Sequence, residues 1–302
     1  MISKNNKLIV ILGQTASGKT DLSVKLAKKF DGEVVSADSR QVYKGMDIGS
    51  GKITRKEMQG IKHHLLDVAS PKIRFSTAQY QKLSLREIRG IQRRGKVPIL
   101  VGGTGFYIQS IVDGIVIPEV APDWKLRKEL EKLSVKEMFA KLQKLDPKRA
   151  EIIDYHNPRR LVRALEIVLK TGKPVPKLDR RPTSNQLGFD VLEIAILKTK
   201  EEIKKNIQKR LEKRLVNDAM IKEIKKLLKS GVSFKRLQEF GLEYRFVAQY
   251  IRGLISHQQM IDAIQLESEH YAKRQMTWFK RDGRIRWIKN YREAEKLIKE
   301  FI

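Results

Sequence analysis

The sequence predicts an α/β protein in which a parallel sheet is flanked by helices and is interrupted by an inserted helical domain. Short runs rich in leucine and β-branched residues alternate with longer segments of helical apolar spacing, the pattern of a parallel sheet covered on both faces. A Gly-rich turn follows the first of these runs. From Asp123 to Leu169 the chain is rich in Lys, Glu, Leu and Ala at helical spacing, which indicates a separate helical region.

The core elements are expected in strand–helix order. Lys7–Leu12 is a buried strand because it is a short β-branched and leucine run that ends at a Gly-rich turn. The segment that follows has apolar residues at roughly helical spacing up to Phe30. The expected elements of this part are strands at 7–12, 32–36 and 97–101 and helices at 18–30 and 78–94.

The character of the chain changes after residue 117. We expect a discontinuous core formed by residues 1–117 and 192–302, and a helical insertion domain formed by residues 118–191. A strand at 191–197 would return the chain to the sheet. The helices expected beyond that strand span 200–230, 243–254 and 257–281.

The chain is strongly basic. Its 302 residues include 63 Lys+Arg against 35 Asp+Glu, a formal net charge of +28, and 41% of the residues are hydrophobic. That hydrophobic fraction excludes a disordered basic tail. Basic side chains outnumber acidic ones by 20 to 9 in residues 1–117, by 17 to 11 in 118–191 and by 26 to 15 in 192–302. This distribution favours nucleic acid or an anionic membrane surface as a partner, although a generally basic proteome would give the same composition.

Cysteine is absent, which excludes disulfides, Cys-ligated zinc and thiol catalysis. The five histidines are too scattered in sequence to predict a metal cage. The apolar run Leu8–Leu12 is too short for a signal peptide, and no stretch approaches the length of a membrane span. We therefore expect a cytoplasmic protein. We also expect a monomer.

The first Gly-rich turn matches the P-loop pattern G-x-x-x-x-G-K-[ST], between a predicted strand and a predicted helix. Its glycines let backbone N–H groups converge on an anion, and the helix N-terminus adds partial positive charge. Lys19 is expected to reach the terminal phosphate, and the Thr20 hydroxyl is expected to ligate Mg²⁺. The motif predicts a P-loop NTPase-like core with an ATP-binding-like site for a diphosphate or triphosphate. The expected phosphate-binding residues are Gly13, Gln14, Thr15, Ala16, Ser17, Gly18, Lys19 and Thr20.

The sequence lacks an evident second element of P-loop NTPases, an apolar strand that ends in a metal-holding Asp. The best candidate strand, at 97–101, ends in Gly102-Gly103-Thr104-Gly105. Chemistry other than NTP hydrolysis is therefore indicated. Thr104 is a candidate to hydrogen-bond a leaving phosphate oxygen, and a simple turn residue is the alternative.

Asp38 follows the second predicted strand, at the sheet edge where open α/β sheets bind ligands. A carboxylate at this place can ligate Mg²⁺ or act as a general base toward an acceptor nucleophile. A helix-capping or solvated Asp is the alternative. His63 and His64 are adjacent and point to different sides of a strand or loop, which favours hydrogen-bonded structural roles over metal ligation.

Six segments of the chain together resemble the bacterial tRNA dimethylallyltransferases, in the same order and at similar spacing. The resemblance spans nearly the whole chain. It implies a Mg²⁺-dependent enzyme that transfers the dimethylallyl group of dimethylallyl diphosphate to N6 of the adenosine 3′ of the anticodon, in tRNAs that read codons beginning with U, and that releases diphosphate. The segments are the P-loop, Asp38–Gly49, His63–Asp67, Gly102–Tyr107, Asn157–Glu166 and Ala272–Phe279.

The resemblance also implies residue roles. Asp38 matches the general base that accepts the N6 proton, and Lys19, Thr20 and Thr104 match groups that hold the diphosphate and organise the metal. That family also has a helical arginine on the diphosphate. Here Arg210 is the better match, and Arg214 stays open because the helix is one residue longer after the arginine. The tRNA contacts that the resemblance implies are Asp38, Ser39, Arg40, Gln41, Arg159, Arg160, Arg163, Lys273, Arg274 and Gln275.

Two other classes of function share parts of this pattern. A small-molecule or nucleotide kinase would also use a P-loop and an Asp base, but it leaves the charge of +28 and the basic segment around Lys273 unexplained. A non-catalytic RNA-binding NTPase would need the strand-end Asp that the sequence lacks.

Overall fold

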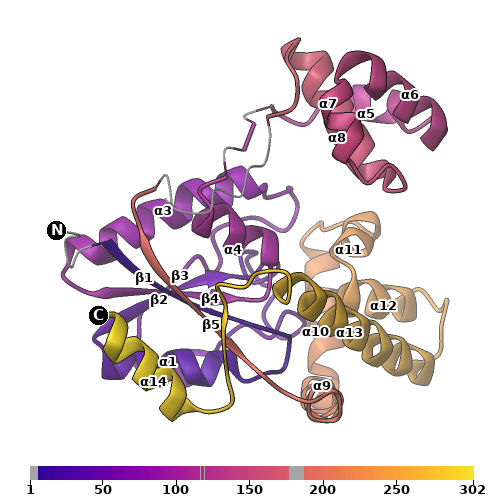
Figure 1. Cartoon of the computed structure of the whole chain (residues 1–302). Helices are drawn as coiled ribbons and strands as arrows, with labels where there is room; N and C mark the ends of the chain where they lie inside the picture. Colours follow the sequence, from indigo (N-terminus) through magenta and orange to yellow (C-terminus); the bar gives the residue numbers. More distant parts are fainter. Residues whose placement is uncertain (1–5, 116, 119, 177–186) are drawn as a thin grey trace. The chain divides into compact units, whose positions relative to one another are not determined.

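The computed structural model describes residues 6–115, 117–118, 120–176 and 187–302. It confirms an α/β fold built on one six-stranded sheet, with the strand order β3-β2-β4-β1-β5-β6 and parallel pairing throughout (Figure 1). The four strands expected from the sequence are all present, with bounds that agree to within a residue. The strands are β1 Lys7–Leu12, β2 Gly32–Ala37, β3 His63–His64, β4 Val97–Gly102, β5 Asp190–Ile196 and β6 Arg286–Ile288.

Helices cover both faces of this sheet (Figure 1). Because successive side chains of a strand point to opposite faces, β1 contributes to two separate cores. Leu8 and Val10 pack in the core that includes α3 and α4, whereas Ile9 and Ile11 pack in the core that includes α1 and α14. This two-sided burial is the reason that the strands are continuous apolar runs. The covering helices are α1 Lys19–Lys29, α3 Thr77–Arg93, α4 Gly105–Val112 and α14 Tyr291–Phe301.

The strand order creates a switch point between β1 and β4. The chain leaves β1 for β2, on the far side of β4, and later leaves β4 for β5, on the far side of β1. In open α/β sheets the ligand crevice lies at the carboxyl ends of two such strands. The P-loop follows β1 and the Gly-rich segment follows β4, so the topology brings both to one place.

Further helices follow β5, and their bounds correct one expectation. The prediction of a single helix over residues 200–230 is wrong, because Asn217 and Asp218 adopt φ of 53° and 55° and break the helix. The helix expected at 243–254 is α12, which a short extra helix precedes, and the one expected at 257–281 is α13. None of the helices that the structure describes is long and apolar enough to cross a membrane. The bounds are α9 Lys200–Leu215, α10 Ala219–Lys229, α11 Phe234–Phe240, α12 Leu242–Ile251 and α13 His257–Phe279.

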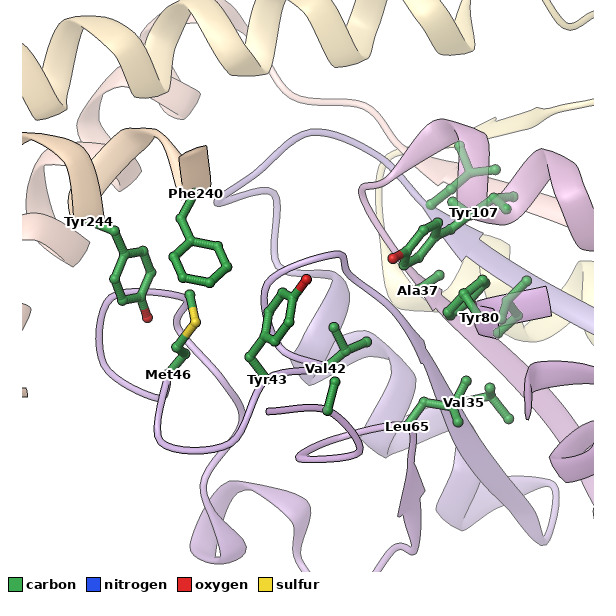
Figure 2. Close-up of a cluster of buried hydrophobic side chains, with 14 of the residues drawn as sticks. Val35, Ala37, Val42, Tyr43, Met46, Leu65, Tyr80, Tyr107, Phe240 and Tyr244 are labelled. Carbon is green, nitrogen blue, oxygen red and sulfur yellow. The ribbon is translucent and has the colours of Figure 1, made fainter. Parts of the chain in front are cut away.

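The connection from β2 to β3 is held by aromatic packing against these helices, and it also contains the short helix α2 Arg55–Met58. Figure 2 shows Tyr43 of this connection beside Phe240, with ring centroids 5.0 Å apart. Phe240 in turn contacts Tyr244 at 5.8 Å. Near the end of β2, Tyr80 and Tyr107 stack at 3.8 Å. The segment that begins with Asp38 is therefore anchored by a buried aromatic cluster.

Residues Ile115–Thr183 form a compact unit separate from the unit of Met1–Gly114 and Ser184–Ile302. The separate unit has its own apolar core. Asp190 and Val191 pair with β1, so the return to the sheet precedes the expected division at residue 192. The helices of the unit are α5 Trp124–Leu130, α6 Val135–Leu145, α7 Pro147–Ile152 and α8 Pro158–Thr171.

Candidate active site

The P-loop joins β1 to α1 in a conformation that only glycine adopts readily at two positions. Gly13 and Gly18 have φ of 145° and 91°. Gly18 is the N-cap of α1, and as a glycine it has no side chain to cap that helix. The first turn of α1 therefore presents backbone N–H donors and the positive end of the helix dipole to an anion.

One pocket lies beside the P-loop, at the carboxyl ends of β2 and β4. It brings together Lys19 of the P-loop, Asp38 from the end of β2 and Arg210 of α9. Thr15 and Thr20 are the other expected phosphate-binding residues that line it. The pocket thus joins three parts of the chain that are distant in sequence, at the place where an α/β sheet binds ligands.

The environment of Lys19 disfavours the charged form of its amine. Its ammonium group donates to the Gln14 carbonyl. Desolvation and the nearby Arg210 guanidinium lower the pKa of Lys19 to about 7, while Asp38 acts in the opposite direction. A bound anion would favour the charged amine, because an opposite charge nearby raises the pKa of a base. The pocket is therefore electrostatically suited to a phosphate group.

Helix α9 supplies the second cation. Arg210 donates from Nη1 to the Thr15 hydroxyl at 3.1 Å, and burial together with Arg214 lowers the pKa of Arg210 to about 10. Arg214, one turn later, donates to the Glu243 carboxylate at 2.7 Å and to the Gly49 carbonyl at 3.2 Å. The structure thus distinguishes the two arginines that the sequence left open. Arg210 lines the P-loop pocket, whereas Arg214 is held in an ion pair.

Asp38 is held in a local turn. Its Oδ1 accepts the N–H of Arg40 at 2.8 Å and the N–H of Gln41 at 3.3 Å. These two bonds orient the carboxyl group through its own backbone. No helix begins at the residue after Asp38, so the helix-capping alternative is wrong. Its position in the pocket favours a chemical role.

Thr104 supports this turn. Its hydroxyl accepts the N–H of Ser39 at 3.0 Å, and it makes no side-chain cap of α4. The Tyr271 phenol donates to the neighbouring Gly103 carbonyl at 3.5 Å. Thr104 therefore links the start of α4 to the turn that carries Asp38. A phosphate contact by Thr104 stays a prediction.

Helix α13 ties the P-loop to the end of β4. The buried Gln275 side chain donates to the Gly103 carbonyl at 2.8 Å and accepts the N–H of Thr15 at 2.7 Å. A Cβ at Gly103 would lie 2.3 Å from Gln275 Nε2, which explains the glycine at that place. Both ends of the Gln275 amide are thus engaged inside the protein, and Gln275 also lines the pocket. A tRNA contact by Gln275 stays a prediction.

Four of the expected tRNA-binding residues are exposed. Arg159 and Arg160 lie in the first turn of α8, and Lys273 and Arg274 lie on α13. They remain candidates for phosphate contacts, because exposed Arg and Lys side chains are the usual ligands of a nucleic-acid backbone.

The remaining expected contacts are partly engaged within the protein. Arg163 donates to the fully buried Glu166 carboxylate at 2.6 Å, so it stabilises its own unit. Arg40 donates from Nε to the Phe240 carbonyl at 2.8 Å. Gln41 donates to the Gly51 carbonyl at 3.2 Å and also lines the pocket. An RNA contact by Arg163 would require this ion pair to open.

Sequence reasoning missed Tyr271 and the pair Ser50 and Gly51, all of which line the pocket. Burial raises the pKa of the Tyr271 phenol to about 12. Tyr271 stands four residues before Gln275, so helical spacing places both on one face of α13 and could have identified it. Ser50 and Gly51 directly follow the segment that begins with Asp38.

The two adjacent histidines have the hydrogen-bonded roles expected for them. His63 Nδ1 lies 2.9 Å from the Ile61 carbonyl. His64 lies between two carboxylates, with Nε2 2.7 Å from Glu33 and Nδ1 3.0 Å from Glu87. In the part of the chain that the structure describes, no group of three His, Asp or Glu side chains could hold a metal ion.

The chain is similar in sequence to known proteins of one family. The IPP transferase family model matches residues 41–282. The tRNA dimethylallyltransferase of Acetivibrio thermocellus is 37% identical over 97% of this chain and 96% of its own length, and that of Anoxybacillus flavithermus is 38% identical over 93% and 90%.

Solved structures show the same similarity. A full-length tRNA isopentenylpyrophosphate transferase from Bacillus halodurans matches with a TM-score of 0.71 and 36% identity, over 98% of this chain and 95% of that one. A eukaryotic dimethylallyltransferase described as acting on tRNA matches with a TM-score of 0.78 and 28% identity, over 94% and 74%. Since the family model covers most of the chain and the relatives align over nearly all of it, the chain belongs to the IPP transferase family, the family of the tRNA dimethylallyltransferases.

Proposed function

We propose that this chain transfers the dimethylallyl group of dimethylallyl diphosphate to N6 of the adenosine 3′ of the anticodon, in tRNAs that read codons beginning with U, and releases diphosphate. The observation that carries the proposal is the presence of Lys19, Arg210 and Asp38 in one pocket. Two cations suit a departing diphosphate, and a carboxylate suits the proton of an incoming nitrogen. The relatives are tRNA dimethylallyltransferases by name, which supports both the tRNA and the dimethylallyl group.

The donor half of the reaction depends on the cations. The bond between C1 of the allyl group and the diphosphate oxygen breaks, and the electron pair leaves with the diphosphate. Lys19 and Arg210 stabilise that growing negative charge, together with the N–H groups at the start of α1. The allylic cation is delocalised and forms readily, so excluding water from it is a further task of the pocket.

The acceptor half depends on Asp38. The N6 lone pair is conjugated with the adenine ring, which makes the nitrogen a weak nucleophile. As N6 bonds to C1, its proton passes to the Asp38 carboxylate, whose orientation is set by the Arg40 and Gln41 N–H groups. The adenosine must leave the anticodon stack to reach a pocket at a sheet edge, as base-modifying enzymes require.

The oxygen groups of the pocket fit Mg²⁺. Thr20 and Asp38 both line it, and the nearby buried Ser17 hydroxyl has no hydrogen-bond partner among the residues that the structure describes. Mg²⁺ usually takes one or two protein oxygens and completes its shell with substrate phosphates and water, so a site without a cluster of acidic residues is suitable. We assign Thr20 as its ligand. Bound there, Mg²⁺ would neutralise charge on the diphosphate.

The RNA half of the proposal rests on charge. A net charge of +28 exceeds what one diphosphate needs, and exposed basic residues occur in both compact units, among them Arg159 and Lys273. These residues are proposed to contact the backbone of the anticodon stem-loop, so that affinity falls steeply with salt. The proposal places the protein in the cytoplasm, where tRNA is available, as a monomer.

A single labelling experiment tests the assignment. The protein is incubated with an anticodon stem-loop and either dimethylallyl diphosphate labelled in the allyl group or ATP labelled at the γ-phosphate. Label from the diphosphate is expected in the RNA, and none from ATP. Transfer of label from ATP to any acceptor would indicate a kinase, and hydrolysis of ATP alone would indicate an NTPase. Either result without allyl transfer would contradict the proposal.

A further inference from the structure

Residues 47–51, which follow the turn that begins at Asp38, form a segment that contributes to the wall of the P-loop pocket. Ser50 and Gly51 line the pocket together with Lys19 and Arg210. Neither Ser50 nor Gly51 belongs to a helix or a strand. Local turn bonds hold them instead: the Gly51 N–H donates to the Ile48 carbonyl at 3.1 Å, and the Ser50 hydroxyl donates to the Met46 carbonyl. Their position therefore depends on how the backbone of residues 46–48 is held.

Glu223 of α10 holds the backbone immediately before them. Its Oε2 accepts the N–H of Asp47 at 2.9 Å and that of Ile48 at 2.6 Å, and its Oε1 accepts the N–H of Gly49 at 3.1 Å. Three successive N–H groups that converge on one anion form a backbone nest. The nest is filled here by a side chain of the protein itself, so its role is to fix the segment.

Tyr244 of α12 completes this contact. Its hydroxyl donates to Glu223 Oε1 at 3.1 Å, and burial, reinforced by the Glu223 charge, raises the pKa of Tyr244 well above its ordinary value. The phenol therefore stays a donor at all working pH values. Figure 2 shows the Tyr244 ring beside Phe240 and Met46, in the buried cluster that anchors the segment.

Two glycines allow the helices to approach the segment this closely. A Cβ at Gly49 would lie 2.7 Å from Tyr244 Cζ, and a Cβ at Gly51 would lie 1.9 Å from Arg214 Nη2. Gly51 also has φ of 62°, which favours glycine. The segment is thus fixed between α9, α10 and α12, by side chains of Arg214, Glu223 and Tyr244 that do not line the P-loop pocket.

We propose that Glu223 is a positioning residue for diphosphate binding. By holding residues 47–49 it sets the distance of Ser50 and Gly51 from Lys19 and Arg210, and so the width of the pocket that receives the diphosphate. The inference rests on the proposed function for the identity of the substrate, while the contacts stand on their own.

Conservative replacements separate the charge of Glu223 from its reach. Glu223→Gln keeps the length but turns one acceptor oxygen into a donor, which opposes the N–H groups of the nest. Glu223→Asp keeps the charge but withdraws it by one methylene. Tyr244→Phe removes only the phenol donor and keeps the ring in the cluster.

Binding of inorganic diphosphate in the presence of Mg²⁺ gives the direct test, measured by calorimetry without RNA. Glu223→Gln is expected to weaken the Kd about tenfold, since hydrogen bonds to a charged group are lost. Glu223→Asp and Tyr244→Phe should weaken it by smaller factors. In the transfer reaction, KM for dimethylallyl diphosphate should rise by a similar factor, with a smaller change in kcat.

Glu293→Gln is the matched control. Glu293 also accepts a backbone N–H, that of Lys289 at 2.8 Å, but it lies in the first turn of α14 and does not line the pocket. It should leave the diphosphate Kd unchanged. If Glu223→Gln lowers Tm but binds diphosphate as the wild type does, Glu223 is merely structural and the inference is overturned. If Glu223→Gln misfolds, the same result for both Glu223→Asp and Tyr244→Phe overturns the inference. Glu223-dependent diphosphate binding without transfer to RNA would refute the proposed function and leave this inference standing.

Discussion

Lys19 should take up a proton when a diphosphate binds, and the uptake should depend on pH. In the pocket, desolvation and Arg210 hold the pKa of Lys19 at about 7, against 10.5 for an ordinary lysine. At this pKa about 90% of Lys19 is neutral at pH 8 and about 10% at pH 6. A diphosphate beside the amine raises its pKa again. Binding should therefore take up about 0.9 proton at pH 8 and about 0.1 proton at pH 6.

Calorimetry in two buffers of different ionisation enthalpy measures this uptake. The ligand is inorganic diphosphate with Mg²⁺, and its own change of protonation contributes to the signal. Lys19→Arg is the control, since a guanidinium stays charged throughout this pH range. The difference in uptake between the wild type and this variant then belongs to Lys19. Equal uptake by both proteins at pH 8 would refute the electrostatic account of the pocket.

Other replacements test the remaining parts of the account. Asp38→Ala should lower kcat by about 100-fold or more, while the Kd for an anticodon stem-loop stays within a few-fold of the wild type. Single-turnover rates measure the first effect and fluorescence anisotropy the second. A large loss of RNA binding would make Asp38 a recognition residue. Gly103→Ala places a Cβ 2.3 Å from Gln275 Nε2 and should weaken diphosphate binding in calorimetry, whereas Gly283→Ala, with open space around it, should not. Glu166→Ala should destabilise the unit of residues 115–183 by about 3 kcal/mol in urea unfolding, because it leaves two partly buried arginines without their carboxylate; an unchanged midpoint would count against that ion-pair network.

Most of the sheet could be predicted from local pattern alone. The run Lys7–Leu12 is apolar on both faces and ends in a P-loop, so its place as a buried strand follows from periodicity and motif together. Strand β6 could not be predicted, because Arg286–Ile288 is only three residues long and has a single fully buried side chain. The break in the helix near Asn217 could not be predicted either, since the apolar spacing continues on both sides of it and only the backbone conformation changes.

Part of the candidate site could be predicted from the sequence, and part could not. The P-loop and Asp38 could be found because each lies next to a recognisable strand. Arg210 and Arg214 could not be separated, since a spacing of four residues puts both on one helical face. What separates them is the tertiary partner Glu243 on α12. Gln275 was expected only as a tRNA contact implied by the resemblance. Its burial against Gly103 could not be predicted, because it depends on the tertiary approach of α13.

The most direct test of the central claim is a single-turnover assay of allyl transfer, with the modified nucleoside mapped in the RNA. Wild-type protein, labelled dimethylallyl diphosphate and an anticodon stem-loop are compared with the same reaction catalysed by Asp38→Asn. The account predicts label on N6 of the adenosine 3′ of the anticodon, and transfer at least about 100-fold slower in the variant although both substrates still bind. Label at another position, or an equal rate in the variant, would contradict it.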